Sequence, residues 1–314
     1  MTLPPSGDTP EPESHPLAGE PSNPLTTTLP PAAGSVEREF TIRAMTQRQL
    51  VTRRFFRHRG ALVGMAVFLF TVILAFSSIG FAGLPGWWNK SYDATATIVR
   101  PGGRPTLDLN LFDGDGISIG AHPFGQDNVG RDYFAVTMRG AQRSLTIAIV
   151  TGLVSTLIGV AVGALAGYFR GWVETLLMRF TDLMITIPLL LLAAVIGKAV
   201  GGLGALTLAF FLGLLVWVTL ARLVRGEFLS LREKEFVEAA RAMGAGPGRI
   251  IFRHILPNAL GTIIVNATLT ISAAVLLETA ISFLGFGVQS PDTSLGVIIS
   301  TYQAAFQTRP WLFW

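Results

Sequence analysis

The side chains that could carry out chemistry in this chain are few and widely spaced. Charged residues make up 14% of the sequence, and the absence of cysteine excludes disulfides, thiolate metal sites and cysteine nucleophiles. A phosphate-binding loop of the Gly-x4-Gly-Lys-Ser/Thr type needs a lysine, and the only lysines, Lys90, Lys198 and Lys234, stand in no such setting. No Ser/His/Asp set or His-Glu-x-x-His helix stands out. We therefore expect no cofactor and no hydrolysis of ATP by the chain itself.

One charged segment, residues 235–257, lies between two long apolar runs and has the pattern of helix, break and helix. Good helix formers fill Phe236 to Met243. The run Gly244 to Gly248, Gly-Ala-Gly-Pro-Gly, cannot continue a helix and is expected to turn the chain. A helix restarts over Arg249 to Leu256, and Pro257 predicts the next boundary.

The first helix of this segment has a surface suited to binding. The residues predicted to share one face are Phe236, Ala239, Ala240 and Met243. Glu238 adds a carboxylate to the same short helix. A short helix with two small alanines on its face is suited to docking into a groove on another protein. The alternative is a basic cytoplasmic loop that only follows the positive-inside rule.

Residues 122–132, His-Pro-Phe-Gly-Gln-Asp-Asn-Val-Gly-Arg-Asp, form a polar, turn-rich run. We expect a tight loop whose side chains cap the next helix. The residues that favour this turn are Gly125, Asp127, Gly130 and Asp132. Residue types that bind metals also occur here, at His122, Asp127, Asp113 and Asp115. Their spacing fits no metal loop, and Asp-Gly-Asp-Gly lacks the remaining ligands of a calcium loop, so we predict folding of an external loop rather than a metal site.

Glu278 stands late in a long apolar run, at the start of Glu-Thr-Ala-Ile-Ser-Phe-Leu-Gly. A carboxylate at membrane depth is costly unless it faces protein or water, so one hypothesis places Glu278 on a translocation path. The alternative places it near the outer interface, paired to a neighbouring helix or to a partner subunit. The sequence leaves both hypotheses open.

The elements that must position these residues are predicted to be membrane helices. Half of the 314 residues are hydrophobic and the mean hydropathy is +0.51, which is too apolar for a soluble domain. The apolar runs predict five spans, at 61–84, 145–169, 183–200, 203–221 and 261–277, the last continuing to 286. The predicted fold class is therefore all-α and polytopic, with an external polar loop at 85–143 and a short charged turn at 170–182.

The second predicted span has a distinctive pattern of small residues. Its glycines fall near four-residue spacing, at Gly152, Gly159, Gly163 and Gly167. Such a stripe lets a neighbouring helix approach closely, so we expect tight helix packing on this face.

The segment before the first span is different in composition. Residues 1–35 hold nine of the 18 prolines and are predicted to be a disordered cytoplasmic tail. Residues 36–60 are basic and end in Arg-Arg-Phe-Phe-Arg-His-Arg, which predicts an amphipathic helix on the inner membrane surface. Nucleic acid is the rival partner for these arginines, but a span follows at once, so we expect none.

The distribution of Lys and Arg predicts the orientation of the chain. With the N-terminus inside, the predicted cytoplasmic segments hold 16 of these residues and the external segments hold 8. This bias fits the positive-inside rule and places a loop at 226–257, which includes the charged segment, in the cytoplasm.

The spacing of the charged segment resembles the EAA loop of binding-protein-dependent ABC transporter permeases. Glu238, Ala239 and Ala240 are followed by Gly244, and then by His-Ile-Leu-Pro, which ends at Pro257. The general pattern ends in Ile-x-Leu-Pro, and histidine here takes the place of the isoleucine. His-Ile-Leu-Pro is similar to the dipeptide and oligopeptide branch, and so is the 122–132 run followed by Gly-Ala-Gln-Arg-Ser-Leu.

The resemblance implies a permease subunit of an importer for dipeptides or oligopeptides in the plasma membrane. The implied partners are a second permease, two ATPase subunits or domains, an external substrate-binding protein and the peptide. In this family the EAA loop is the docking site of the ATPase, so Glu238, Ala239, Ala240 and Gly244 are the implied coupling residues. The permease itself is not expected to be an enzyme.

Other functions remain open on the sequence. Permeases for nickel or another small solute share this architecture. A channel or a secondary transporter is a different class, and the latter usually has paired broken helices or inverted repeats, which the sequence does not show. Relatives continue after a Pro-Trp pair into one more span, whereas this sequence stops at Trp314, so we expect a sixth helix to be missing.

Overall fold

The computed structural model describes residues 55–81, 83–110 and 116–313. The chain divides into two units, Met1–Arg57 and His58–Trp314, and the description below concerns the second. The predicted tail 1–35 and most of the predicted 36–60 helix lie outside the described residues.

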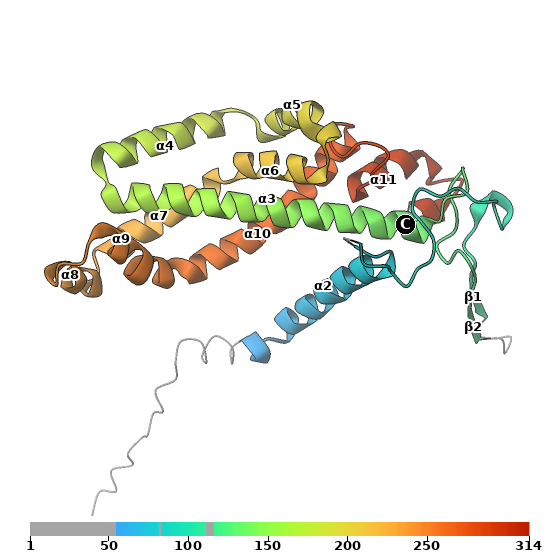
Figure 1. Ribbon diagram of the computed structural model, residues 1–314, viewed down its shortest axis with the longest axis horizontal. Helices are drawn as coiled ribbons and strands as arrows, with labels where there is room; N and C mark the ends of the chain where they lie inside the picture. The colour runs from blue at the N-terminus through green and yellow to red at the C-terminus, as the bar shows by residue number, and fades with distance from the viewer. Residues whose placement is uncertain (1–54, 82, 111–115, 314) are drawn as a thin grey trace, which may run out of the picture. The chain divides into compact units, whose positions relative to one another are not determined.

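The described chain is built almost entirely of helices, which confirms the all-α class (Figure 1). The helices are α2 (Arg59–Ser78), α3 (Tyr133–Phe169), α4 (Gly171–Thr186), α5 (Leu189–Val200), α6 (Ala205–Val216), α7 (Val218–Arg232), α8 (Glu235–Ala242), α9 (Pro247–Arg249), α10 (Leu256–Phe283) and α11 (Leu295–Tyr302). A π-helical turn, η3 (Ile250–Ile255), joins α9 to α10. One antiparallel hairpin, β1 (Leu107–Asn110) with β2 (Gly116–Ile119), lies in the predicted external loop.

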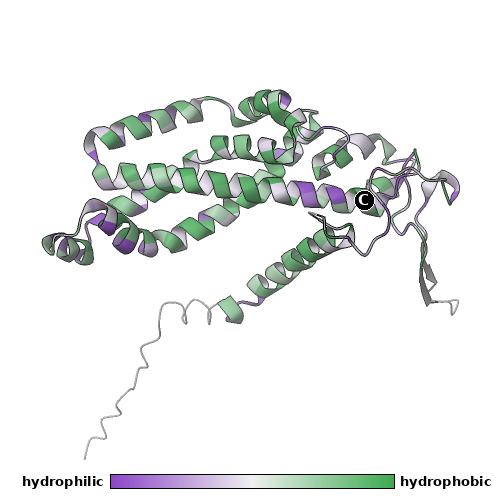
Figure 2. Cartoon of the chain, viewed as in Figure 1, coloured by the Kyte–Doolittle hydropathy of each residue, from purple (hydrophilic) through white to green (hydrophobic). Residues whose placement is uncertain are grey.

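The lengths and bends of these helices agree with five membrane spans. In the described part, α2, α3 and the continuous helix Pro247–Phe283 are each long and apolar enough to cross a bilayer. Two further spans arise if each bent pair counts as one, with a bend of 83° between α4 and α5 and of 47° between α6 and α7. Figure 2 shows the hydrophilic colour gathered around α8 and α9 and near the start of α3, with the apolar colour between.

Helix α3 is the packing centre of the bundle, because α2, α6, α7 and α10 all contact it (Figure 1). The glycine stripe makes this possible. A Cβ at Gly163 would lie 2.5 Å from the backbone oxygen of Ala221, and one at Gly167 would lie 2.6 Å from the Phe228 Cβ, both on α7. The predicted close packing is therefore confirmed, and it takes place within the chain.

Two boundaries predicted from hydropathy are wrong. Residues 133–143, assigned to the external loop, form the first turns of α3, because Asp132 caps that helix by accepting the Ala135 N–H at 2.9 Å. Residues 171–182, assigned to a charged turn, are helical and belong to α4. The chain reverses instead at Arg170 and Gly171, whose φ angles are 56° and 58°.

The boundary predicted at Pro257 coincides with the change from the π turn to α10, which begins at Leu256, although the chain stays helical across it. Proline lacks an N–H and its ring collides with the carbonyl four residues back. The turn just before it is widened to π geometry, and the Leu256 N–H bonds the Ile251 carbonyl five residues back. In an α-helix, residues five apart point about 140° apart, whereas a π turn aligns them. Ile250 and Ile255 are accordingly both buried.

Candidate coupling and translocation sites

Helix α8 presents one face to its own chain and the other to the surroundings. Val237 is fully buried and packs in a cluster with Phe228 and Ile255. Phe236 and Met243 are exposed, Met243 by 81% of its surface. The outer face therefore carries large apolar side chains that the described part of the chain leaves uncovered.

Ala239 and Ala240 of α8 do not share a face, contrary to the sequence prediction. Ala240 is 1% exposed, whereas Ala239 is exposed. Neighbouring helical residues point about 100° apart, and the bundle covers only the Ala240 side of α8. Glu238 is exposed beside Ala239. The structure thus places Glu238 and Ala239 on the accessible side and Ala240 in the packing that holds α8 in place.

Gly244 ends α8 in a left-handed conformation, with φ at 80°. Its N–H donates to the Arg241 carbonyl at 2.9 Å, and the Ala245 N–H donates to the Ala240 carbonyl at 3.0 Å. These two bonds form a Schellman motif, which favours glycine at this position. No atom lies within 4 Å of a Cβ built at Gly244, so a side chain there would meet strain but no clash.

After the turn that ends α8, a single long helix leads into the bundle. From Pro247 to Phe283 the chain runs through α9, the π turn and α10 for 37 residues without a break. A displacement of α8 can therefore be carried by a rigid element into the middle of the bundle.

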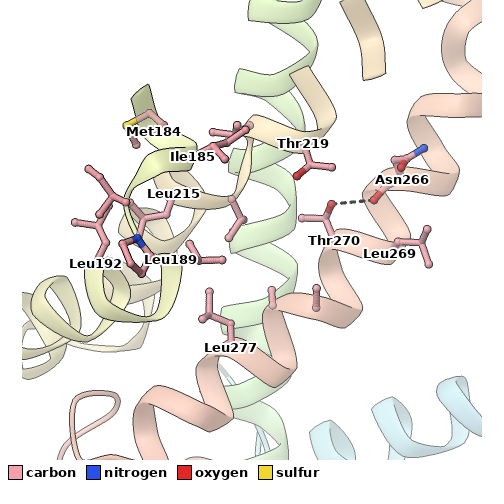
Figure 3. Close-up of a pocket in the computed structure, with 16 residues that line it drawn as sticks. Met184, Ile185, Leu189, Leu192, Leu215, Thr219, Asn266, Leu269, Thr270 and Leu277 are labelled. Carbon is pink, nitrogen blue, oxygen red and sulfur yellow. Dashed lines mark hydrogen bonds between the residues drawn. The ribbon is translucent and has the colours of Figure 1, made fainter. Parts of the chain in front are cut away.

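A cavity of about 540 Å³ lies where the two bent helix pairs meet α10 (Figure 3). The bend at Ile187 and Pro188 separates the 16 residues of α4 from the 12 of α5, and the bend at Trp217 separates α6 from α7. Asn266 and Thr270 lie near the middle of the 28-residue α10. The cavity is thus situated half-way along all three elements, and its size is that of an ordinary ligand site.

The described residues that line the cavity include no charged side chain. One wall is aliphatic and includes Met184, Leu192 and Leu215. Polar side chains come from α7 and α10, at Thr219, Asn266 and Thr270 (Figure 3). The sequence interpretation missed this set, although polar residues inside apolar runs are a signal for a site.

Glu278 is fully buried and does not line this cavity, although its neighbour Leu277 does. Its two carboxylate oxygens accept hydrogen bonds of 2.7 Å from the hydroxyls of Ser144 on α3 and Ser282 on α10. Ser144 in turn accepts the Leu295 N–H at 3.1 Å, at the start of α11. This arrangement joins three helices, as the neighbouring-helix hypothesis expects, and a place on the path stays a prediction.

The comparisons with known proteins agree with this geometry. Residues 159–312 match the family described as the binding-protein-dependent transport system inner membrane component, and residues 46–95 match the N-terminal transmembrane domain of oligopeptide transport permease C. The oligopeptide transport system permease protein OppC of Mycobacterium tuberculosis is 37% identical over 270 residues, which cover 85% of this chain and 86% of that protein. OppC of Haemophilus influenzae is 34% identical over 264 residues, which cover 83% and 78%. The chain belongs to this permease family.

Membership in the family confirms the resemblance seen in the sequence and makes the permease a multi-pass protein of the inner membrane. The structure also corrects one argument from the sequence against a secondary transporter. The sequence did not show broken helices, but the permease has two bent pairs, α4 with α5 and α6 with α7. Family membership, and not the absence of bends, therefore assigns the class.

In the segment of the permease between α2 and α3, the 122–132 run folds as the predicted turn. Asp132 caps α3 and also accepts hydrogen bonds from Trp88 Nε1 at 3.0 Å and from His122 Nδ1 at 2.6 Å. Lys90 lies 3.8 Å from the same carboxylate. Trp88 and Lys90 are remote in sequence, so the turn's spacing could not reveal them.

Asp127 belongs to a second cluster in this segment, away from His122. It pairs with Arg131 at 2.6 Å and accepts a hydrogen bond from the Tyr302 hydroxyl at 3.0 Å. Burial raises the pKa of Tyr302, and the negative charge of Asp127 raises it further. Among the described residues no group of three His, Cys, Asp or Glu is arranged to hold a metal, and Asp113 and Asp115 lie outside them.

Proposed function

We propose that this permease is one of two membrane subunits of an ATP-driven importer that moves dipeptides or oligopeptides across the inner membrane. The permease has no nucleotide-binding motif of its own, so ATP hydrolysis belongs to partner subunits docked on α8. A second permease and an external binding protein complete the complex. The N-terminus and α8 face the cytoplasm in this proposal, as the Lys and Arg bias predicts.

The observation that carries the proposal is the connection from α8, through the turn at 243–246, to the continuous helix Pro247–Phe283, which lines the cavity. The exposed face of α8 offers Phe236 and Met243 for insertion into a groove of the ATPase. Val237 and Ala240 fix the opposite face of α8 to the bundle. Closure of the ATPases on ATP would move α8, and the helix Pro247–Phe283 would carry that movement to the cavity wall. Alternating access then results from the shift of a rigid docked element.

The peptide cargo is supported by the relatives, which are named oligopeptide permeases. The cavity is consistent with that cargo, because it offers an apolar wall together with a small polar one. A nickel ion would require ligands of another kind, and the described lining offers no histidine or carboxylate.

Reconstitution of the full complex in lipid tests the proposal. The permease is co-purified with the second permease, the ATPases and the binding protein, and ATP hydrolysis and uptake are measured with peptide and with nickel. We expect peptide-loaded binding protein to stimulate ATP hydrolysis and peptide to accumulate inside vesicles. Stimulation by nickel alone, or uptake that continues without the ATPases, would overturn the proposal.

A further inference from the structure

The three polar side chains of the cavity stand on neighbouring helices and face a common space. Thr219 comes from α7, and Asn266 and Thr270 come from successive turns of α10. Figure 3 shows the Thr219 and Thr270 side chains directed toward each other across the gap between the two helices. We refer to Thr219, Asn266 and Thr270 as the polar strip.

Thr219 differs from most threonines in the helices of this chain. Thr156, Thr181 and Thr270, for example, donate their hydroxyls to the carbonyl four residues back. Within the described part of the chain the Thr219 hydroxyl has no hydrogen-bond partner. The residue four back, Leu215, belongs to α6 on the other side of the 47° bend. The bend therefore leaves the hydroxyl of the exposed Thr219 without a partner in its own helix, so it can bond a group that enters the cavity.

The other two members of the strip also keep bonding capacity. The Asn266 amide nitrogen donates to the Thr262 carbonyl at 2.9 Å, which uses one of its two hydrogens. The Thr270 hydroxyl donates to the Asn266 carbonyl at 2.9 Å and retains its acceptor lone pairs. The strip thus offers both donors and acceptors within one cavity wall.

These observations point to the substrate group that the cavity accepts. A peptide unit presents one N–H donor and one carbonyl acceptor, which complement a strip that has both. The remaining lining is apolar and no described lining residue is charged, so an ionised terminus would lose its hydration there without a counter-ion. We propose that the polar strip hydrogen-bonds backbone amides of the peptide in transit, and that the cavity takes an uncharged middle section of the peptide. This inference rests on the proposed function and names the chemistry of its site.

The test compares variants of the strip in the reconstituted complex. Thr219→Val removes the hydroxyl at nearly constant volume, and Asn266→Leu removes the amide. Thr268→Val is the matched control, since Thr268 lies on α10 outside the cavity lining and bonds only its own helix. Uptake is measured at equal amounts of assembled complex for a tetrapeptide and for the same peptide with N-methylated central amides, which keeps both charged ends.

We expect each strip variant to slow uptake of the unmodified peptide by up to about tenfold, the effect of one lost hydrogen bond, and to slow the N-methylated peptide less, because that peptide keeps its carbonyl acceptors but lacks the central N–H donors. The control should match the original chain for both peptides. If the original chain imports no peptide, the proposed function is wrong and the inference falls with it. If it imports peptide but the strip variants do so equally well, or if both peptides slow equally, only the inference is overturned.

Discussion

At the scale of single residues, Gly244 sets the end of α8 through its backbone alone. Its φ of 80° is costly for any residue with a side chain, by about 1–2 kcal/mol, and more so for a β-branched one. We therefore expect Gly244→Val to weaken docking of the ATPase and to reduce peptide uptake severalfold.

Gly244→Asn is the matched control, because asparagine enters the left-handed region more easily. It should retain most of the uptake measured in vesicles. The space around the Cβ is open in both cases, so a difference between the two variants reports backbone strain. Equal, normal uptake for Gly244→Val would show that the turn is not needed in this form.

Glu278 is the second residue whose surroundings make a sharp prediction. Ser144 and Ser282 each accept a backbone N–H, so each directs its own hydroxyl hydrogen to the carboxylate. A glutamine would present an NH₂ donor to one of these hydroxyls and lose a hydrogen bond. We expect Glu278→Gln to lower the free energy of unfolding by about 1–3 kcal/mol, seen as a lower Tm of the purified permease.

Ser144→Ala supplies the comparison for Glu278→Gln. If the network holds α3, α10 and α11 together, the two changes are expected to be non-additive, because each breaks the same interaction. A normal Tm for Glu278→Gln together with altered uptake would instead support a place for Glu278 on the translocation path.

At the scale of elements, the π turn adds one residue to the helix that joins α9 to α10. Deleting Arg253, whose side chain is exposed, should let the turn relax to α geometry. Because the wider π turn rotates the chain less per residue, an α turn with one residue fewer spans nearly the same angle, and the parts on either side keep nearly the same relative orientation. We expect the deletion variant to reach the membrane, to bind the ATPase and to retain peptide uptake.

Arg253→Ala is the control for the deletion, since it removes the same side chain and keeps the residue count. It should retain uptake, measured in the same vesicles. Loss of uptake in both variants would assign the effect to the Arg253 side chain, and loss in the deletion variant alone would show that coupling needs the π turn itself.

The helices also show which features of the fold could be predicted from the sequence. Hydropathy and the Gly-Ala-Gly-Pro-Gly run correctly predicted α8 and the break after it, because these depend on local composition. The five predicted spans correspond to three long helices and two bent pairs in the described chain. The π turn before Pro257 was not predicted, because it depends on the packing that buries Ile250 and Ile255. The start of α3 was missed because polar residues there, such as Gln142, bond the carbonyls of Ala75 and Gly80 around the end of α2.

Some of the candidate site residues could likewise be recognised in the sequence, and others could not. Glu238 and Gly244 lie in one short segment, so their spacing could be recognised in the sequence. The polar strip could not, because Thr219 and Asn266 are 47 positions apart and meet only after α7 packs beside α10. Ala240 was placed on the wrong face because a short motif does not reveal which side of its helix the rest of the chain covers.

At the scale of the whole molecule, the permease exposes one face of α8, the short helix that precedes the long helix Pro247–Phe283. Glu238 lies in the first turn of α8, where the helix dipole favours a carboxylate, and its side chain is exposed. Nothing in the packing of the described chain requires its charge. We therefore predict that Glu238 acts through contact with another subunit.

Glu238→Lys tests that role directly. It should leave the permease in the membrane and folded, but abolish stable association with the ATPase and hence peptide uptake. Glu235→Lys is the matched control: it reverses a charge in the same first turn, with the same loss of about 0.3–1 kcal/mol in the dipole interaction. If α8 needed only its helical stability, both variants would lose uptake equally. If Glu238 contacts the ATPase, only Glu238→Lys should lose it, and co-purification with the ATPases distinguishes the two cases. Normal assembly and normal uptake in Glu238→Lys would show that coupling depends on the apolar face of Phe236 and Met243 without this carboxylate.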